Sequence, residues 1–321
     1  MKEPLPRLDH APELREKLMP LCRLAPGEVW TDPERGHRVG VLDGCSRTDV
    51  DTLLKGLSCT LAVNDPPYNI TVGSRNTPQL FSSGTEDYLE FTAGWVEALL
   101  PHMAAHSHFY LWIGADQTRG FQPLPDVMLL LRKYPELKSR SFITLRNQRG
   151  YGTQKNWMCA RQELLYYTLG DPPFQVAYTE IPRILKGYYK EVGGERSENS
   201  RRSRSPFIRP GNVWVDIQQV FYRMEENVPG AYAQKPLSSI ERLLVTSSRQ
   251  GDTVADLFAH SGTTLLAAEL HNRRCCTMDI DPVFAELAIR RLEHYRKTGR
   301  KGWQCAHPFP ELEVRDPSGK F

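Results

Sequence analysis

Hydrophobic and polar positions alternate in blocks along the chain, and the period of the alternation changes many times. Short apolar runs, which are typical of buried strands, are separated by longer segments in which apolar residues recur at helical spacing. The runs predict strands over residues 39–42, 60–63, 109–113, 142–145, 163–168, 253–257 and 274–280. The longer segments predict helices over residues 13–19, 50–57, 87–105, 236–247, 263–271 and 282–295. Strands that alternate with helices favour an α/β fold.

The alternation is interrupted between residues 171 and 233. Within this segment, residues 183–209 contain eight Lys or Arg against three Glu, and such a composition cannot pack a core of its own. We therefore predict a main domain in two halves separated by a small irregular basic insert. The predicted divisions are an N-terminal extension over 1–37, a first half over 38–170, the insert over 171–233, a second half over 234–297 and a tail over 298–321.

The overall composition is that of an ordinary globular protein. Of 321 residues, 40% are hydrophobic and 25% are charged, which suffices for one large core or one core with a smaller lobe. No run of about 18 apolar residues occurs, and the N-terminus lacks the apolar segment of a secretory signal. The sequence therefore predicts no membrane span, and a cytoplasmic location is expected.

Cysteine and histidine, which often mark redox or metal sites, give no such signal here. The seven cysteines are odd in number and show no CxxC spacing, which favours reduced thiols. His102 and His106 share a face of the helix predicted over 87–105, but no HExxH motif or Cys/His set accompanies them. We predict no metal site.

The tetrapeptide Asp65-Pro66-Pro67-Tyr68 stands at the end of an apolar run and carries the most specific chemistry. A flat nitrogen-bearing ring could stack on Tyr68 while the Asp65 carboxylate and the Pro66 carbonyl accept hydrogen bonds from its NH2 group. Two acceptors would make that nitrogen a nucleophile. The motif therefore indicates chemistry on an exocyclic amine.

A second candidate site lies where a predicted strand ends and a predicted helix begins, over residues 256–264. Backbone N–H groups and the helix dipole at such a turn can receive an anion. The next predicted strand reaches Asp279, at the place where nucleotide-binding α/β folds hold ribose hydroxyls with an acid. This pair of features predicts a nucleoside-bearing cofactor, although the turn alone also fits an ordinary strand-to-helix connection.

Several separated motifs in one order resemble the amino-methyltransferases of DNA in the beta arrangement, in which the catalytic tetrapeptide precedes the cofactor loop. The matching segments are 64–70, 87–91 with Trp95, 234–236, 241–243, 251–252 and 256–264, and the resemblance covers most of residues 38–295. It implies a Rossmann-like methyltransferase fold with permuted motif order and a seven-stranded mixed sheet flanked by helices. It also implies S-adenosylmethionine as methyl donor and double-stranded DNA as substrate.

The resemblance assigns roles to individual residues. The flipped base would be held by the catalytic motif Asp65, Pro66, Pro67 and Tyr68. The cofactor would be bound by Asp43, Lys235, Asp256, Phe258, Ser261, Gly262, Thr263, Thr264 and Asp279. Within this set, Asp279 would bind the ribose, Asp43 would reach the adenine or methionine end, and Lys235 would lie beside the methionine carboxylate. His260 departs from the glycine that the family carries there, and its side chain would crowd the cofactor or force a different turn.

The same resemblance bears on the substrate. Family members whose tetrapeptide begins with Asp usually methylate adenine N6, and those that begin with Ser usually methylate cytosine N4. Asp65 therefore favours adenine, with cytosine N4 as the alternative on the same scaffold. A further alternative is a catalytically silent DNA-binding homologue, which His260 motivates. Methylation of cytosine carbon-5 is rejected, because no Pro-Cys dipeptide supplies its nucleophile.

The basic insert occupies the place of the target-recognition region in the beta arrangement. Its cationic side chains are predicted to contact DNA phosphates and guanine edges, namely Arg183, Lys186, Arg201, Arg202, Arg204 and Arg209. The alternative is a solvated basic loop with no partner. By the same resemblance, a homodimer and a cognate restriction endonuclease as functional partner are expected.

Overall fold

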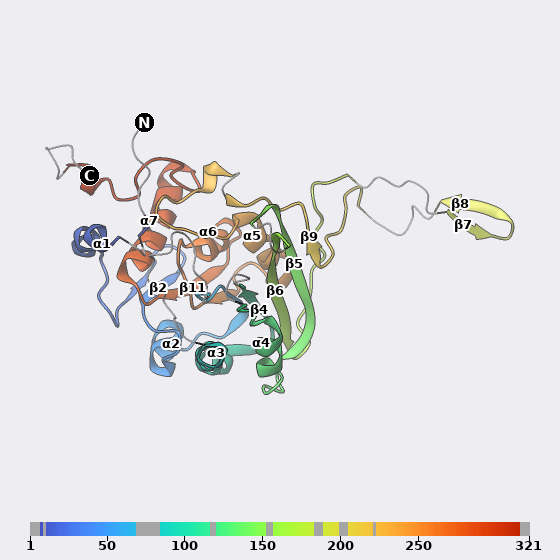
Figure 1. Ribbon diagram of the computed structural model, residues 1–321, viewed down its shortest axis with the longest axis horizontal. Helices are drawn as coiled ribbons and strands as arrows, with labels where there is room; N and C mark the ends of the chain where they lie inside the picture. Colours follow the sequence, from blue (N-terminus) through green and yellow to red (C-terminus); the bar gives the residue numbers. More distant parts are fainter. Residues whose placement is uncertain are drawn as a thin grey trace.

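A mixed sheet runs through the centre of the molecule in the computed structural model (Figure 1). The structure describes residues 7–8, 11–68, 84–115, 120–151, 157–182, 189–198, 205–220 and 223–314. In these residues the sheet has nine strands, in the order β1 (Val29–Thr31), β2 (Arg38–Val41), β11 (Arg274–Asp279), β10 (Thr253–Asp256), β3 (Cys59–Asn64), β4 (Met103–Ile113), β6 (Cys159–Leu169), β5 (Lys138–Tyr151) and β9 (Val213–Trp214).

The five strands from β2 to β4 run parallel, and β6 is antiparallel to both of its neighbours. The predicted α/β fold with a mixed sheet flanked by helices is confirmed. The sheet is wider than the seven strands expected, because the short strands β1 and β9 pair with the edges of β2 and β5.

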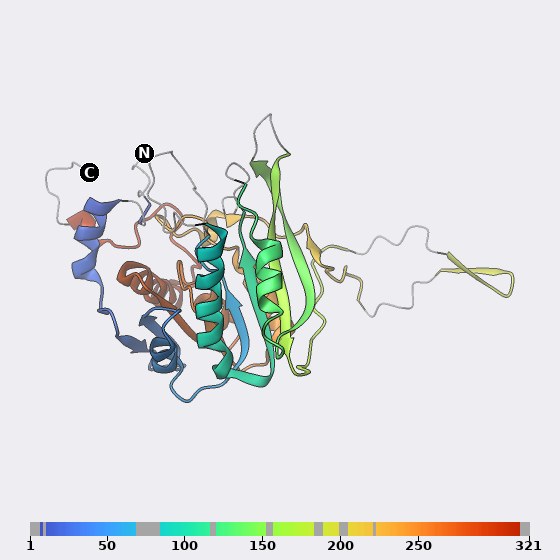
Figure 2. The same cartoon turned by 60° about the horizontal axis from the view of Figure 1, so that its bottom comes forward.

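Helices cover both faces of the sheet. On one face, α5 (Leu237–Ser247), α6 (Thr263–Leu270) and α7 (Pro282–Thr298) bury apolar side chains against β3, β4 and β10. On the other face lie α2 (Arg47–Leu54), α3 (Thr85–Leu99) and α4 (Leu124–Leu131). Figure 2 shows α3 and α4 side by side in front of the sheet. No helix in the described part of the chain is both long and apolar enough to cross a membrane.

A third apolar cluster lies outside α7 and is built by the two ends of the described chain. Leu18 of α1 (Pro12–Leu18) and Phe309, which precedes α8 (Glu311–Val314), are buried against Val283 and Phe284 of α7. The short helix predicted over 13–19 therefore packs on the outside of the main domain, as expected. The segment after residue 298 also contributes buried apolar groups, which its polar composition did not indicate.

The helix predicted over 87–105 is shorter than expected. It ends at Leu99, a 3-10 turn η2 (Leu100–His102) follows, and β4 begins at Met103. Pro101 explains the difference, because it has no N–H for the helical ladder, and the backbone becomes extended at Met103. Other 3-10 turns are η1 (Met19–Leu21) and η5 (Met224–Glu226).

The segment predicted as an irregular insert is only partly separate from the main domain. β7 (Tyr189–Val192) and β8 (Glu195–Glu198) form a two-stranded sheet of their own, drawn apart from the central sheet in Figure 1. Farther along, Trp214 of β9 and Ile217 are buried in the cluster that α5 shares with the sheet. The end of this segment thus belongs to the main core, and the two-residue strand there was too short to give a sequence pattern.

Candidate active site

The carboxyl ends of five neighbouring parallel strands meet at one edge of the sheet, and the predicted site residues follow them. Asp43 comes after β2, Asp279 ends β11, Phe258 comes after β10, Asp65 after β3 and Gly114 after β4. β3 and β10 pair directly, with Ala62 opposite Ala255. The base-binding and cofactor motifs of the sequence are therefore adjacent in space, at the edge where open α/β sheets bind ligands.

Asp65, Lys235 and Tyr68 form a hydrogen-bonded cluster. The Lys235 ammonium, which is nearly buried, lies 2.8 Å from Oδ1 and 2.6 Å from Oδ2 of Asp65. It also donates to the Tyr68 hydroxyl at 3.0 Å, and that hydroxyl donates to Asp65 Oδ1. Burial, with the negative charge of Asp65, raises the pKa of Tyr68 well above its usual value. The tyrosine therefore stays a neutral hydrogen-bond donor.

The cluster gives Lys235 a different partner from the one that the resemblance implied. Lys235 stands two residues before α5 and is 170 residues from Asp65 in the sequence, yet both carboxylate oxygens contact its ammonium. The same nitrogen lies 5.0 Å from the centre of the Tyr68 ring and 5.2 Å from that of Trp112. Lys235 therefore contacts the catalytic motif, and its place beside the methionine carboxylate stays a prediction.

The Tyr68 ring is positioned by a glycine. A Cβ atom added to Gly114 would stand 2.4 Å from Cγ of Tyr68 and within 2.9 Å of both Cδ atoms. The ring therefore lies directly against the backbone at the end of β4. Pro66 is buried and Pro67 half-buried, and the fixed φ of each proline limits the ways in which the tetrapeptide can move.

Asn64 joins the two motifs at the level of the backbone. It is fully buried, and its Oδ1 accepts a hydrogen bond of 3.2 Å from the N–H of Leu257, the residue before Phe258. This hydrogen bond fixes the position of the catalytic tetrapeptide along β3 relative to the cofactor loop after β10. Because the contact is buried, its loss would leave polar groups without partners.

Two carboxyl groups on the cofactor side are difficult to ionise. Burial raises the pKa of Asp256 to about 7, against the opposing hydrogen bonds from Thr264 and from the N–H of Phe258. Burial likewise raises the pKa of Asp279 to about 7. Oδ1 of Asp279 accepts the N–H of Asp281 and Oδ2 accepts the N–H of His260, both at 3.0 Å. Asp279 therefore holds the cofactor loop as well as facing it.

The start of α6 is shaped by Gly262 and by a buried arginine. Gly262 has φ 70°, and a Cβ there would lie 2.8 Å from Cα of Ala288 in α7, so only glycine fits. Arg291 of α7 donates to the Ser261 carbonyl at 2.9 Å and to Thr263 Oγ1 at 3.1 Å. Ser261 and Thr263 thus direct polar groups into the protein, where they fix the shape of the loop.

His260 adopts the backbone conformation that the expected glycine would have favoured. Its φ is 42°, which is uncommon for a residue with a side chain and costs on the order of 1 kcal/mol or more. Its ring packs against Phe284 in the first turn of α7, with ring centres 4.8 Å apart. This contact directs the imidazole toward α7, so the expected crowding is relieved on that side.

Phe258 and Asp43 complete the predicted set. The Phe258 ring packs edge-on to Trp95 at 5.6 Å and near Phe91 of α3, so it is partly committed to the core. Asp43 is exposed, and its Oδ1 accepts the N–H of Cys45 in the turn before α2. Both stand at the same edge as Asp279, as the strand pairing requires.

Three important residues were missed from the sequence. Gly114 looks like any strand-end glycine, and Tyr88 gave no sign that its buried hydroxyl would have no partner in the described residues. The burial of Arg291 could have been found from the sequence, because it stands between Ile289 and Leu292 on a helix with an apolar face. An arginine on such a face must either reach solvent or have its N–H groups hydrogen-bonded. It is fully buried, and burial lowers its pKa to about 10.

Most of the predicted DNA contacts cannot be placed. Arg183, Lys186, Arg201, Arg202 and Arg204 lie outside the described residues. Arg209 is described and exposed, four positions before Val213 of β9. For these residues the contact with DNA stays a prediction.

Comparison with known proteins agrees with this geometry. The model of the DNA methylase family, N6_N4_Mtase, matches residues 59–290. The chain is 28% identical over 252 residues to the DNA adenine methyltransferase YhdJ of Escherichia coli K12, which covers 74% of this chain and 78% of that protein.

Two solved structures show the same fold. The cytosine-N4-specific PvuII DNA methyltransferase aligns with a TM-score of 0.55 at 12% identity, over 84% of this chain and 89% of that one. TTHA0409 of Thermus thermophilus, complexed with S-adenosyl-L-methionine, aligns with a TM-score of 0.52 at 21% identity, over 84% and 99%.

Proposed function

Because the chain belongs to the DNA methylase family, we propose that it transfers a methyl group from S-adenosylmethionine to the exocyclic N6 amine of an adenine in double-stranded DNA. The observation that carries the proposal is the cluster of Asp65, Lys235 and Tyr68 on the strand next to the cofactor loop. It sets hydrogen-bond acceptors and an aromatic face beside each other, one strand away from Phe258.

A base inside a duplex cannot reach this cluster, so the target must rotate out of the stack, at a cost of a few kcal/mol. Tyr68 replaces part of the lost stacking, and Gly114 holds its ring in place. The Asp65 carboxylate and the Pro66 carbonyl accept hydrogen bonds from the amine, which directs the nitrogen lone pair away from the ring. Asp65 has lone pairs beyond those that Lys235 and Tyr68 occupy.

The residues on the other side of the edge fit a nucleoside-bearing donor. Each Asp279 oxygen accepts one backbone N–H and keeps capacity to accept a ribose hydroxyl. The sharp turn at Gly262 opens α6, whose N-terminal N–H groups favour a negative group. The similarity to a structure complexed with S-adenosyl-L-methionine supports this identity for the donor. When bound, this cofactor supplies an electrophilic methyl group on a positively charged sulfur.

The reaction balances without a covalent enzyme intermediate. The amine lone pair forms the new N–C bond, the electrons of the broken C–S bond stay on sulfur, and one amine proton leaves. Asp65 is placed to accept that proton, and the Lys235 ammonium holds both of its carboxylate oxygens in place. Alignment of the reacting groups supplies most of the rate enhancement.

Adenine is proposed over cytosine because the tetrapeptide begins with Asp65 and because a relative of similar length is a DNA adenine methyltransferase. Cytosine N4 is the second candidate, supported by the fold shared with a cytosine-N4-specific enzyme. Both amines present the same hydrogen-bonding groups to Asp65 and Pro66. A homodimer and a cognate restriction endonuclease are further proposals from the family resemblance.

The test is to incubate the protein with labelled S-adenosylmethionine and DNA of mixed sequence, and then to digest the DNA to nucleosides. We expect N6-methyladenine, and no label with the Asp65→Ala variant. If the labelled nucleoside is N4-methylcytosine instead, the second candidate function is correct. Absence of any labelled nucleoside, with DNA still bound, would identify a silent DNA-binding homologue.

A further inference from the structure

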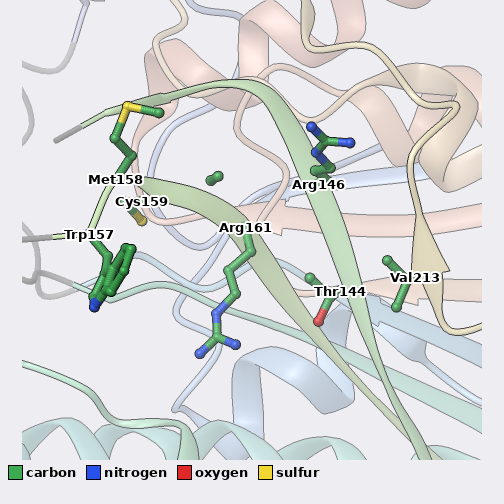
Figure 3. A pocket seen from close by; sticks show the side chains of 8 residues that line it. Thr144, Arg146, Trp157, Met158, Cys159, Arg161 and Val213 are labelled. Carbon is green, nitrogen blue, oxygen red and sulfur yellow. The ribbon is translucent and has the colours of Figure 1, made fainter.

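The outer end of the β5–β6 pair carries an exposed apolar patch beside a cavity of about 570 Å³. Trp157 is 88% exposed and Met158 66% exposed, and both stand just before β6. Val213 of β9, also exposed, lines the same cavity (Figure 3). Among the described residues Trp157 is the most exposed of the large apolar side chains. Apolar groups gathered in this way usually mark a binding surface.

Two arginines occupy opposite positions on the paired strands that carry the patch. Arg146 of β5 and Arg161 of β6 are register partners, so their side chains leave the sheet on the same face. Both are exposed and line the cavity, as Figure 3 shows. Arg161 forms an ion pair of 2.9 Å with the buried Glu163. Like charges directly opposite each other disfavour strand pairing, and the single carboxylate of Glu163 leaves this pair with a net positive charge that an anionic partner would offset.

The patch lies at the same edge of the sheet as the catalytic cluster. Asn64 is opposite Leu111 on β4, and Ile113 is opposite Glu163 on β6, so Arg161 stands beyond the end of β4. β6 is two strands away from β3. Adjacent strands are about 4.8 Å apart and residues along a strand about 3.3 Å apart, so the backbones of Arg161 and Asp65 are roughly 15 Å apart in the plane of the sheet. DNA rises about 3.4 Å per base step, so this spans a few nucleotides.

We propose that the cavity bounded by Arg146, Trp157, Met158 and Arg161 binds a nucleotide of the substrate DNA a few steps from the target base. This base leaves the duplex stack, at a cost of a few kcal/mol, and stacks on Trp157, while the two guanidinium groups contact the adjoining phosphates. This inference rests on the proposed function. Charge favours DNA over an apolar protein surface, because an aromatic face flanked by cations is the pattern that holds a base and its backbone.

The test uses the whole protein and a short fluorescein-labelled duplex of mixed sequence, with binding followed by anisotropy over a series of salt concentrations. Trp157→Ala is expected to weaken DNA binding by about 5- to 100-fold, and Trp157→Phe to keep most of the affinity. The double variant Arg146→Ser with Arg161→Ser is expected to lower the slope of log affinity against log salt by up to about 2.

Matched controls come from a second cavity, of about 170 Å³, at the opposite edge of the sheet. Arg249 lines it and is exposed, and the exposed Phe174 follows its lining residue Pro173. Phe174→Ala and Arg249→Ser should leave DNA affinity and salt slope unchanged. Calorimetric cofactor binding should be unchanged in every variant. Thermal unfolding should shift to lower temperature in the double arginine variant, because Glu163 loses its cation, and in Phe174→Ala, because ring contacts with His108 and Tyr166 are lost.

Unchanged DNA affinity in Trp157→Ala would overturn the inference, and so would an equal loss in Phe174→Ala. A parent protein that binds DNA through this surface but methylates neither base would overturn the proposed function and leave the DNA contact standing. If the parent methylates DNA and Trp157→Ala binds and reacts normally, the proposed function stands and the DNA contact at Trp157 is overturned. The two proposals therefore fail separately.

Discussion

Replacing Gly114 with alanine adds a methyl group against the Tyr68 ring. The new Cβ would stand 2.4 Å from Cγ and within 2.9 Å of both Cδ atoms. Favourable carbon contacts lie at about 3.5–4.0 Å, so the ring must retreat by roughly 1 Å. Gly114 is not among the residues with positive φ, so the backbone itself accepts alanine and the effect is steric. The Tyr68 hydroxyl, and with it Asp65 and Lys235, would move with the ring.

A displacement of about 1 Å at a reacting group can cost about a hundredfold in rate. We therefore expect Gly114→Ala to lower kcat for methyl transfer by about a hundredfold while the cofactor Kd stays near its parental value. The cofactor loop follows β10, and β10 lies on the other side of β3 from β4. A change at Gly114 should therefore affect kcat without affecting cofactor binding. The measurements are steady-state transfer of labelled methyl to DNA and calorimetry with S-adenosylmethionine.

Gly94→Ala is the matched control. Gly94 lies inside α3, and an added Cβ would meet Cys45 at 3.5–3.6 Å, which is ordinary contact. Activity should match the parent, and the unfolding free energy should rise by up to about 1 kcal/mol, because alanine favours a helix over glycine. Parental kcat in Gly114→Ala would show that the ring position is not required. An equal loss of cofactor affinity would show that the damage lies elsewhere.

Three further outcomes are expected. Lys235→Met should lower kcat by about 10- to 100-fold, because Asp65 and Tyr68 lose a buried hydrogen-bond donor; a parental kcat in stopped-time assays would refute this. Cofactor affinity should rise with pH through about 7 as Asp279 ionises, and calorimetry should find Asp279→Asn weak and pH-independent. Burial raises the pKa of Asp256 from 3.8 to about 7, so the stability it contributes is complete below pH 3.8 and is lost as pH rises through 7, by at most about 4 kcal/mol. Urea unfolding of Asp256→Asn should show a smaller fall in stability over this range than the parent, because, of these two carboxyl groups, only Asp279 still ionises there.

The sequence predicted the strands that carry the chemistry because their apolar runs are local and strongly marked. β3 and β10 were placed to within two residues at each end, which put Asp65 and Phe258 at strand ends. The helix before β4 was predicted to end at residue 105 but ends at Leu99, because the apolar spacing continues past Pro101. The place of Asp279 followed from the order of elements alone.

Contacts between distant residues could not be predicted in the same way. No local pattern indicates that the ammonium of Lys235 reaches a carboxylate 170 residues earlier in the chain. The close approach of Gly114 to Tyr68 depends on the height of β4 relative to β3, which sequence periodicity does not fix. Arg291 was detectable as an arginine on an apolar helix face, but its partners, the carbonyls of Ser261, Glu226 and Lys301, come from three separate segments.

These long-range contacts explain why the order of motifs along the chain does not disturb the chemistry. The base side and the cofactor side are brought together by the direct pairing of β3 with β10, by the bond from Leu257 to Asn64, and by Lys235 on Asp65. All three act at the sheet edge, and none passes through β7 and β8. The segment that holds β7 and β8 can therefore change in length or sequence while the relative position of the two sides is kept, and its role in DNA recognition stays a prediction. An exchange of that segment should alter the methylated sequence more than the rate.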